Sequence, residues 1–223
     1  MLDRDAATLD AAVAGMASNA AHAIHADVSR PGDAARAIDA AQEIAGRLDA
    51  LVNNAGVAAF RPVLETSYEE WREMMATNLD GPFLMTNAAA PHLAETKGAV
   101  VNIGSISGLR ASTLRAAYGT SKAALAHLTK QQAAELGEIG VRVNLVAPGP
   151  VETAMAAKVH TPEIRADYRD AIPLARYGLE AEIAAAVFWL SSAEASFVTG
   201  QTLAVDGGFD AAGIGLSTLR GER

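Results

Sequence analysis

The chain has 223 residues, 50% of them hydrophobic, which is enough for one hydrophobic core and predicts a single domain over residues 1–223. It carries 18 Lys and Arg residues against 26 Asp and Glu residues, and the net charge of −8 disfavours nucleic acid and anionic membranes as partners. Cysteine is absent, which excludes disulfides, thiolate nucleophiles and Cys-ligated metals, and the five histidines lack the spacing of metal ligands, so no metal is predicted.

We find no sequence signal for export or for a membrane span. The first residues, Met1 to Asp5, contain neither a basic region nor an apolar stretch. No apolar run approaches the roughly 18 residues that a spanning helix needs. We therefore expect a soluble, cytoplasmic protein.

Helical and strand-like stretches alternate along the chain. Apolar residues at helical spacing predict helices, and short apolar runs that end at turn residues predict strands. In chain order, we predict a helix at 4–16, a strand at 23–28, a helix at 33–47, a strand at 48–53, a helical region at 67–95 interrupted near Gly81 and Pro82, a strand at 99–103, a helix at 116–136, a strand at 141–147, a helix at 180–190 and a strand at 202–205. Strands this apolar are buried on both faces, which predicts an α/β fold with a doubly wound parallel sheet, Rossmann-like, in three layers (α/β/α).

Two segments have a looser pattern. Residues 150–177 contain several prolines and glycines around short helical pieces, and they follow the end of a predicted strand. We expect this segment to act as a substrate lid. Residues 210–223 form a C-terminal tail in which the apolar residues show only weak helical or strand periodicity.

Polar residues follow the predicted strands. Asp27 lies near the end of one strand, and Asn53-Asn54-Ala55-Gly56 ends the next. Ser105 follows the third, and Pro148-Gly149 follows the fourth. Ligands of open α/β sheets bind at the carboxyl ends of the strands, so these residues are the first candidates for a site.

A tyrosine and a lysine open the long helix that follows Ser105. Tyr118 and Lys122 are four residues apart, so they lie on one face of that helix, about one turn from each other. An ammonium beside a phenol stabilises the phenolate. We therefore expect the pKa of Tyr118 to lie below its usual value of about 10, so that the phenol exchanges a proton near neutral pH.

The ordered set of these residues resembles the short-chain dehydrogenase/reductase family. Ser105 lies 13 residues before Tyr118 in Tyr118-x-x-x-Lys122, and the Asn53–Gly56 and Pro148-Gly149 motifs stand in the matching order. Asn78 in the long helical region and Val205-Asp206-Gly207-Gly208 near the end complete the pattern. The match runs from Asp3 to Gly208.

The resemblance implies catalytic roles for four residues. Tyr118 would be the general acid in carbonyl reduction and the general base in alcohol oxidation, and Ser105 would hydrogen-bond the substrate oxygen. Lys122 would bind the nicotinamide ribose and lower the pKa of Tyr118. Asn78 would hold a water molecule in a proton relay, although a helix bend near Gly81 would also account for an Asn at this point.

The resemblance also implies a nicotinamide cofactor, which would carry out the hydride transfer. The residues that match cofactor contacts are Asp3, Asp27, Val28, Asn54, Ala55, Gly56, Tyr118, Lys122, Pro148, Gly149, Val151 and Thr153. Asp3 matches the acidic residue that accepts hydrogen bonds from the adenosine ribose, which favours NAD. NADP is the alternative, because Arg4 lies beside Asp3 and an arginine at this position can pair with a 2′-phosphate.

The largest departure from the family pattern lies before Asp3. Neither a first strand nor a Gly-x-x-x-Gly-x-Gly turn precedes it, and that turn normally provides the backbone N–H groups that bind the pyrophosphate. The first βα unit of the fold is therefore expected to be missing. Three explanations compete: Met1 is an internal methionine of a longer product, the protein is naturally truncated, or a partner chain supplies the strand. We favour the first, because the catalytic set is intact.

Several residues have a second interpretation. Tyr118 and Lys122 could be an ordinary surface pair, which the placement of Ser105 argues against. For Asn53, a structural role is as good an explanation as ligand contact. Arg110 and Arg115 lie between Ser105 and Tyr118 and could recognise an acidic substrate, although solvated loop charges are the commoner case.

The sequence thus predicts an oxidoreductase that transfers a hydride between NAD(P) and a secondary alcohol or ketone of a small, polyol-like substrate. The alternative is a non-catalytic family member that acts as a structural or regulatory oligomer partner. The helices around 80–95 and 116–136 carry more apolar and small residues than one buried stripe needs, which predicts a homodimer. Phe209, Ile214 and Leu216 in the tail could add a second contact and give a homotetramer.

Overall fold

The computed structural model describes residues 1–16 and 20–212, and it contains the predicted alternation of helices and strands. All paired strands are parallel. The strands are β1 (Leu2–Asp3), β2 (Ile24–His25), β3 (Ala50–Asn53), β4 (Ala99–Ile103), β5 (Arg142–Pro148) and β6 (Thr202–Val205). The α-helices are α1 (Ala6–Ala14), α2 (Pro31–Ala45), α3 (Tyr68–Met75), α4 (Gly81–Thr96), α5 (Ala116–Leu136), α6 (Ala154–Val159), α7 (Pro162–Ala171) and α8 (Glu180–Ser191).

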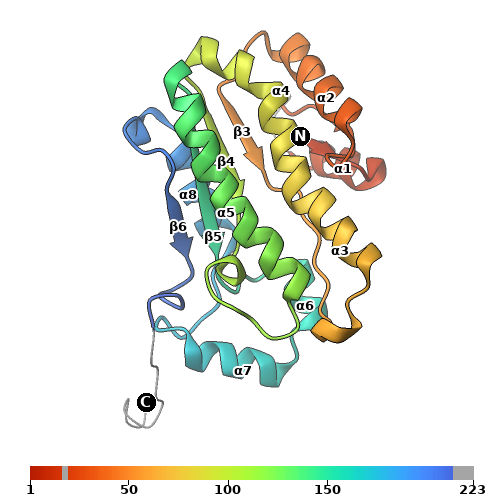
Figure 1. Cartoon of the computed structure of the whole chain (residues 1–223), viewed down its shortest axis with the longest axis vertical. Coiled ribbons are helices and arrows are strands. Elements are labelled where there is room, and N and C mark those ends of the chain that lie inside the picture. Colours follow the sequence, from red (N-terminus) through yellow and green to blue (C-terminus); the bar gives the residue numbers. More distant parts are fainter. Residues whose placement is uncertain (17–19, 213–223) are drawn as a thin grey trace.

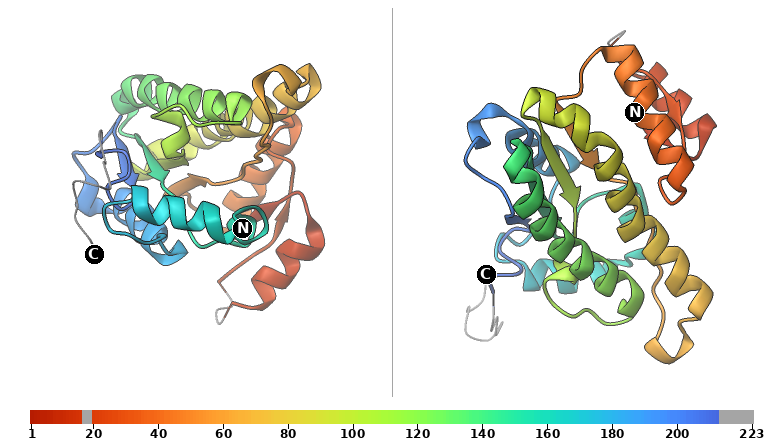
Figure 2. Two further views of the ribbon diagram at one scale, coloured as in Figure 1. Left: turned by 90° about the horizontal axis from the view of Figure 1, so that it is seen from below. Right: turned by 45° about the horizontal axis from the view of Figure 1, so that its top comes forward.

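The main sheet has the strand order β3-β4-β5-β6, and helices cover both of its faces. Figures 1 and 2 show α4 and α5 on one face and α8 on the other. Neighbouring residues of β4 point to opposite faces of the sheet. Val100 packs in the core cluster under α4 and α5, and Val101 packs in the cluster under α8. Both side chains are fully buried. This burial on two faces explains the continuous apolar strands and confirms the predicted doubly wound, three-layer α/β fold.

β1 and β2 form a separate two-stranded sheet. Within the described residues, the facing edges of β1 and β3 have no strand partner on that side, and a cavity of about 170 Å³ lies between them. Leu2 lines it from β1 and Leu51 from β3, and Val52 of β3 is 42% exposed. The resemblance to the short-chain dehydrogenase/reductase family implies the strand order 3-2-1-4-5-6-7. β1 and β3 match the second and fourth strands of that order, and the first strand would lie between them.

Local side-chain chemistry sets the ends of the first helices. Asp5 precedes α1 and accepts a hydrogen bond from the backbone N–H of Thr8, so this helix begins at Ala6 rather than at Arg4. Pro31 opens α2, two residues earlier than predicted, because proline needs no N–H partner in the first turn. Gly46, with φ of 72°, ends α2 in the left-handed conformation.

The helical region 67–95 is continuous but locally widened. Ser67 and Glu70 form a capping box at the start of α3. Residues Ala76–Asp80 then form a π-helical turn that leads directly into α4. Pro82 has no N–H to donate to the carbonyl of Asn78, which favours the wider turn at this point. The predicted interruption is thus a π-turn rather than a break.

The predicted lid segment contains two short helices, α6 and α7, at the carboxyl end of the sheet. Thr153 caps α6 and Thr161 caps α7 through their hydroxyl groups. Its opening and closing stay a prediction. Ile214 and Leu216, which were expected to extend an oligomer contact, lie outside the described residues. Within the described residues, no helix is both long and apolar enough to cross a membrane.

Candidate active site

Ser105 is placed by the end of β4 and the helix that packs against it. The residues after Ser105 form a 3₁₀ turn, Ile106–Gly108, which lies directly on the backbone of α5. A Cβ atom at Gly108 would stand 2.6 Å from the carbonyl carbon of Lys122, so only glycine permits this approach. The close approach brings Ser105 to Tyr118, as the sequence predicted.

The pKa of Tyr118 is raised above its ordinary value, chiefly because the phenol is buried. The Ser105 side chain and the positive charge of Arg115 act in the opposite direction, because both stabilise the phenolate. The expectation that Lys122 lowers this pKa is therefore not met in the structure. Burial outweighs the nearby charges, and the cation that acts on the phenol is Arg115.

Lys122 lies deep in the site. Its side chain is only 5% exposed, and Nζ donates a hydrogen bond to the carbonyl oxygen of Ile103 over 2.8 Å. Nζ lies 5.9 Å from the centre of the Tyr118 ring. Burial lowers the pKa of the Lys122 ammonium from 10.5 to about 8. The two residues thus share one face of α5, as their spacing predicts.

Asn78 lies in the π-helical turn and is fully buried. Its Nδ2 donates to the carbonyl of Val57 at 2.9 Å and to Ser121 Oγ at 3.0 Å, and its Oδ1 accepts from the N–H of Val57 at 2.9 Å. Both amide hydrogens are therefore used inside the protein. The side chain ties the loop after β3 to α5, so a water held by this residue would have to donate to an oxygen, either the second lone pair of Oδ1 or the backbone carbonyl.

Gly56 lies where this loop meets the site. A Cβ atom here would stand 3.3 Å from Asn78 Oδ1 and 3.5 Å from Lys122 Nζ. At the end of β3, just before this loop, Asn53 donates to Asn102 Oδ1 at 2.8 Å and to Thr86 Oγ1 at 3.2 Å. Asn53 therefore has the structural role, and Gly56 is the member of the motif that leaves space next to the predicted catalytic residues.

Several predicted adenosine contacts line the cavity between β1 and β3. The cavity is bordered by Asp3, Val28, Asn54 and Ala55, together with residues of β3 and the start of α4. Asp27 is close in sequence, but its carboxylate accepts hydrogen bonds from the N–H and hydroxyl of Ser29, which lower its pKa. Its side chain therefore shapes the turn before α2.

The predicted nicotinamide contacts lie at the end of β5. The N–H of Gly149 bonds to the carbonyl of Val205 at 3.1 Å, which continues the pairing with β6. Val151 forms an isolated parallel bridge with Gly178, and Thr153 caps α6. The structure thus places Pro148, Gly149, Val151 and Thr153 along one connection between the sheet and the lid segment.

Comparison with known proteins gives the family. A sequence profile described as enoyl-(acyl carrier protein) reductase matches residues 1–210. The chain belongs to the short-chain dehydrogenase/reductase family. It is 40% identical over 216 residues to 2-(S)-hydroxypropyl-CoM dehydrogenase 3 of Xanthobacter autotrophicus, a match that covers 94% of this chain and 85% of that protein. Relatives of this kind place the chain among oxidoreductases that act on CH–OH groups.

Two further similarities bear on function. The chain is 40% identical over 217 residues to a protein of the same organism named inactive 2-(S)-hydroxypropyl-CoM dehydrogenase 2, with 95% of this chain and 94% of that protein covered. Among solved structures, a gluconate 5-dehydrogenase from Burkholderia cenocepacia, in complex with NADP and tartrate, has a TM-score of 0.87 and 32% identity. That match covers 95% of this chain and 85% of the other.

Sequence reasoning missed part of the polar network behind this dehydrogenase-like site. Asn102, the last but one residue of β4, accepts from Asn53 and donates to Thr129 Oγ1 on α5 at 2.9 Å. All three side chains are buried. An asparagine within an otherwise apolar strand was the available signal, because a buried amide needs partners. No group of three or more potential metal ligands occurs among the described residues.

Proposed function

We propose that the chain is an NAD(P)-dependent oxidoreductase that interconverts a secondary alcohol and its ketone. The observation that carries the proposal is the gathering of Ser105, Tyr118 and Lys122 at the carboxyl end of β4. A hydroxyl, a phenol and an ammonium at this edge form a set that can position a substrate oxygen and exchange its proton.

Tyr118 would move the proton. In alcohol oxidation its phenolate oxygen takes the proton of the substrate hydroxyl, and in ketone reduction the phenol returns a proton to the substrate oxygen. Ser105 would hold that oxygen by a hydrogen bond. When bound, a nicotinamide cofactor would supply the hydride-transfer chemistry at the carbon that bears this oxygen.

The residues present fit the two ends of a nicotinamide dinucleotide. The cavity beside Asp3 offers space and a carboxylate on the adenosine side, and the open space at Gly56 gives access to the Lys122 ammonium on the ribose side. The pyrophosphate in the middle of the cofactor has no comparable binding site among the described residues, because they include no glycine-rich turn. A strand that fills the cavity between β1 and β3 would bring such a turn to this edge. The absence of the first βα unit stays a prediction, and sequence upstream of Met1 in the same reading frame tests it.

We propose NAD as the cofactor, with NADP as the alternative. Asp3 ends β1, and its Oδ1 accepts a hydrogen bond from the N–H of Asp5 at 2.9 Å. Its position at the cavity favours ribose hydroxyls and repels a 2′-phosphate. Dissociation constants for NAD⁺ and NADP⁺ test this: Asp3→Ala should weaken NAD⁺ binding, and tighter binding of NADP⁺ by the unchanged protein would contradict the assignment.

The substrate would be a small, polyol-like secondary alcohol. The likeness to a gluconate 5-dehydrogenase supports this class, because gluconate is a polyol acid. The test is formation of reduced cofactor with a panel of secondary alcohols and polyols, monitored by absorbance, with Tyr118→Phe as the inactive control. Absence of turnover across the panel, in protein that binds the cofactor, would contradict the proposed reaction.

A second candidate is a non-catalytic oligomer partner. The relative whose name calls it inactive supports this candidate, because the match covers nearly all of that protein. A chain of this kind would keep its fold and assembly surfaces without binding nicotinamide. Isothermal titration of NAD⁺ and NADP⁺ separates the two candidates: a stable oligomer that binds neither dinucleotide favours the non-catalytic one.

In either case we propose a homodimer or homotetramer. On α4, Phe83 is 46% exposed, and the small side chain of Ala123 is exposed on α5, as a helix-to-helix contact across a two-fold axis requires. Phe188 on α8 is 76% exposed and Phe197 is fully exposed, which supports a second contact. Cytoplasmic location stays a prediction.

A further inference from the structure

Within residues 1–16 and 20–212, the guanidinium of Arg115 has no acidic partner. Arg110, in the same loop, also lacks an ion pair there, but its Nη1 donates to the backbone carbonyls of Phe209 at 2.6 Å and of Asp210 at 3.3 Å. Arg115 is half-buried, yet no carboxylate oxygen in the described part of the chain lies within 4.0 Å of its charged group. Its side-chain hydrogen bond is long, with Nη2 donating to the Tyr168 hydroxyl over 3.3 Å. A guanidinium has five N–H donors, so most of the donors of this cation lack a protein acceptor. Burying a guanidinium without hydrogen-bond acceptors costs free energy, and a bound ligand that supplies acceptors would remove this cost.

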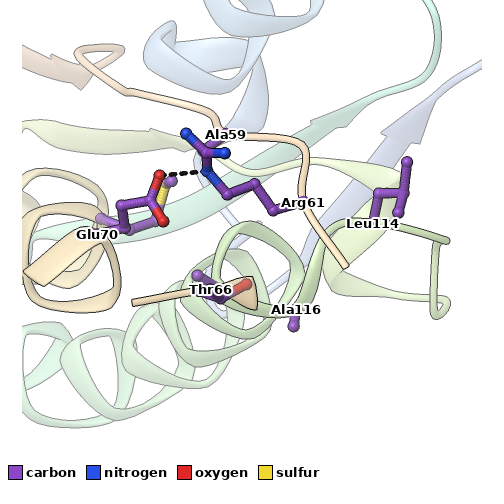
Figure 3. Close-up of a pocket in the computed structure, with 8 residues that line it drawn as sticks. Ala59, Arg61, Thr66, Glu70, Leu114 and Ala116 are labelled. Atoms are coloured by element: carbon purple, nitrogen blue, oxygen red, sulfur yellow. Dashed lines mark hydrogen bonds and ion pairs between the residues drawn. The ribbon is translucent and has the colours of Figure 1, made fainter. Parts of the chain in front are cut away.

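The adjacent Arg61 shows the contrast. The two arginines pair through their backbones in an isolated parallel bridge, but the Arg61 guanidinium points to Glu70 and forms an ion pair with it (Figure 3). The cavity beside that pair measures about 10 Å³, which leaves no room for a substrate. Arg165 of the lid is likewise paired, with both oxygens of Glu152. Arg115 thus provides uncompensated positive charge.

The position of Arg115 is fixed before any ligand binds. Leu114 has a φ of 62°, a left-handed conformation that a branched residue adopts only when its surroundings enforce it. The carbonyl of Leu114 accepts a hydrogen bond from the N–H of Arg61 at 3.0 Å, which holds the turn. The guanidinium lies 4.8 Å from the centre of the Phe60 ring, at cation–π distance. A ligand would meet a pre-positioned cation and lose little entropy in ordering it.

Arg115 also lies between the reacting phenol and the lid. It precedes Tyr118 by three residues at the start of α5. Burial raises the pKa of Tyr118 and the charge of Arg115 opposes this, whereas burial lowers the pKa of His160 and the charge of Arg115 adds to this. His160 follows α6, and its Nδ1 lies 3.0 Å from the hydroxyl of Tyr177. Aromatic contacts join His160 and Tyr177 to Tyr168, the residue that Arg115 contacts. The far end of a substrate whose oxygen faces Tyr118 would meet this arginine.

We propose that Arg115 binds an anionic group of the substrate and thereby selects a hydroxy acid, or another secondary alcohol that carries an oxyanion. The inference rests on the proposed oxidoreductase function and names its substrate class. The planar guanidinium presents paired N–H groups that match the two oxygens of a carboxylate. Arg115 would be a specificity-determining residue, and it would take no part in the transfer of the proton or the hydride.

The test measures binding in the absence of turnover. The probes are two keto acids, 4-oxopentanoate and 5-oxohexanoate, and their amides, which have nearly the same shape but no charge. Each is titrated calorimetrically into the protein, without cofactor and with NAD⁺, a form that cannot reduce a ketone. We expect at least one acid to bind about 10-fold or more tightly than its amide, as one charge-assisted bidentate contact allows. Arg115→Gln should abolish this preference, and Arg115→Lys should retain part of it.

The matched control is Arg61→Gln, which removes a neighbouring guanidinium that Glu70 already neutralises. The preference for the acid should persist in this variant. Equal binding of acid and amide by the unchanged protein, or a preference that survives Arg115→Gln, would overturn the inference. If Arg115→Gln melts at a clearly lower temperature, the comparison relies on Arg115→Lys, in which an undiminished preference has the same meaning. Failure of the proposed function itself is seen separately, as binding of neither NAD⁺ nor NADP⁺.

Discussion

The ammonium of Lys122 donates a hydrogen bond to the carbonyl oxygen of Ile103, 2.8 Å away. Ile103 is the last residue of β4, and Ser105 follows two residues later. One buried cation therefore joins the helix that carries Tyr118 to the strand that presents Ser105. This link makes the relative position of the predicted catalytic residues depend on Lys122, and it also makes the stability of the fold depend on the charge of this residue.

Lys122 should give the protein an alkaline stability signature. Because its pKa falls from 10.5 unfolded to about 8 folded, the folded state loses the proton first. The cost of burying the charge is fully present below pH 8 and disappears as pH rises towards 10.5, so stability should increase over this window. The shift corresponds to about 3 kcal/mol at most. Urea unfolding of the unchanged protein and of Lys122→Met, at several pH values, measures it. If the difference in unfolding free energy between the unchanged protein and Lys122→Met does not change with pH, the lowered pKa of Lys122 is contradicted.

Tyr118→Phe should abolish turnover and leave cofactor binding nearly unchanged, because it removes the transferable proton and very little volume. The expected loss in kcat is at least about 10²-fold, the lower range for general acid–base catalysis. Steady-state kinetics and titration with NAD⁺ provide the two readouts. Retention of a substantial fraction of kcat would exclude Tyr118 as the acid and base.

Gly108→Ala should lower activity by moving the Ser105 turn away from α5. Its new methyl group would collide with the Lys122 carbonyl carbon, which as backbone cannot swing aside. We expect kcat to fall about 10-fold or more, because misplacement of a catalytic group by about 1 Å is costly. Gly32→Ala is the matched control, since no atom lies within 4 Å of a Cβ at that position. Equal activity in the two variants would show that the contact does not position Ser105.

Asn78→Ala should destabilise the fold by about 2 to 4 kcal/mol, because it removes three hydrogen bonds and leaves the backbone of Val57 and the hydroxyl of Ser121 with fewer partners. Chemical denaturation measures the change. Thr113→Ala, at an exposed position in the loop before α5, serves as a control and should change stability by less than about 0.5 kcal/mol. A similarly small effect of Asn78→Ala would contradict the structural role of its side chain.

Phe83→Asp should weaken the proposed dimer, because it places a charge on the exposed face of α4 where a second copy would pack. Analytical ultracentrifugation at micromolar concentration measures the molecular mass. Leu64→Asp controls for loss of an exposed apolar side chain elsewhere, since Leu64 is 96% exposed outside these helices. A monomer in the unchanged protein would refute the assembly prediction.

The amino-acid sequence by itself determined the order and type of most elements. Apolar runs such as Ala99–Ile103 can be buried on two faces only in a covered parallel sheet, so periodicity led directly to the fold class. The predicted catalytic set was also accessible, because Tyr118 and Lys122 are neighbours on one helix and Ser105 stands at a strand end. These features depend on residues that are close in sequence.

Only the tertiary structure decided which residues meet across the sheet. Asn53 contacts Asn102, 49 residues away, so its structural role could not be read from its own motif. The pKa of Tyr118 responds to burial and to Arg115 more than to the helical neighbour Lys122, because desolvation is set by everything that packs around the phenol. The isolation of Arg115 from carboxylates likewise depends on where α7 and the loop at Phe60 fold. Such contacts are long-range, and local periodicity carries no information about them.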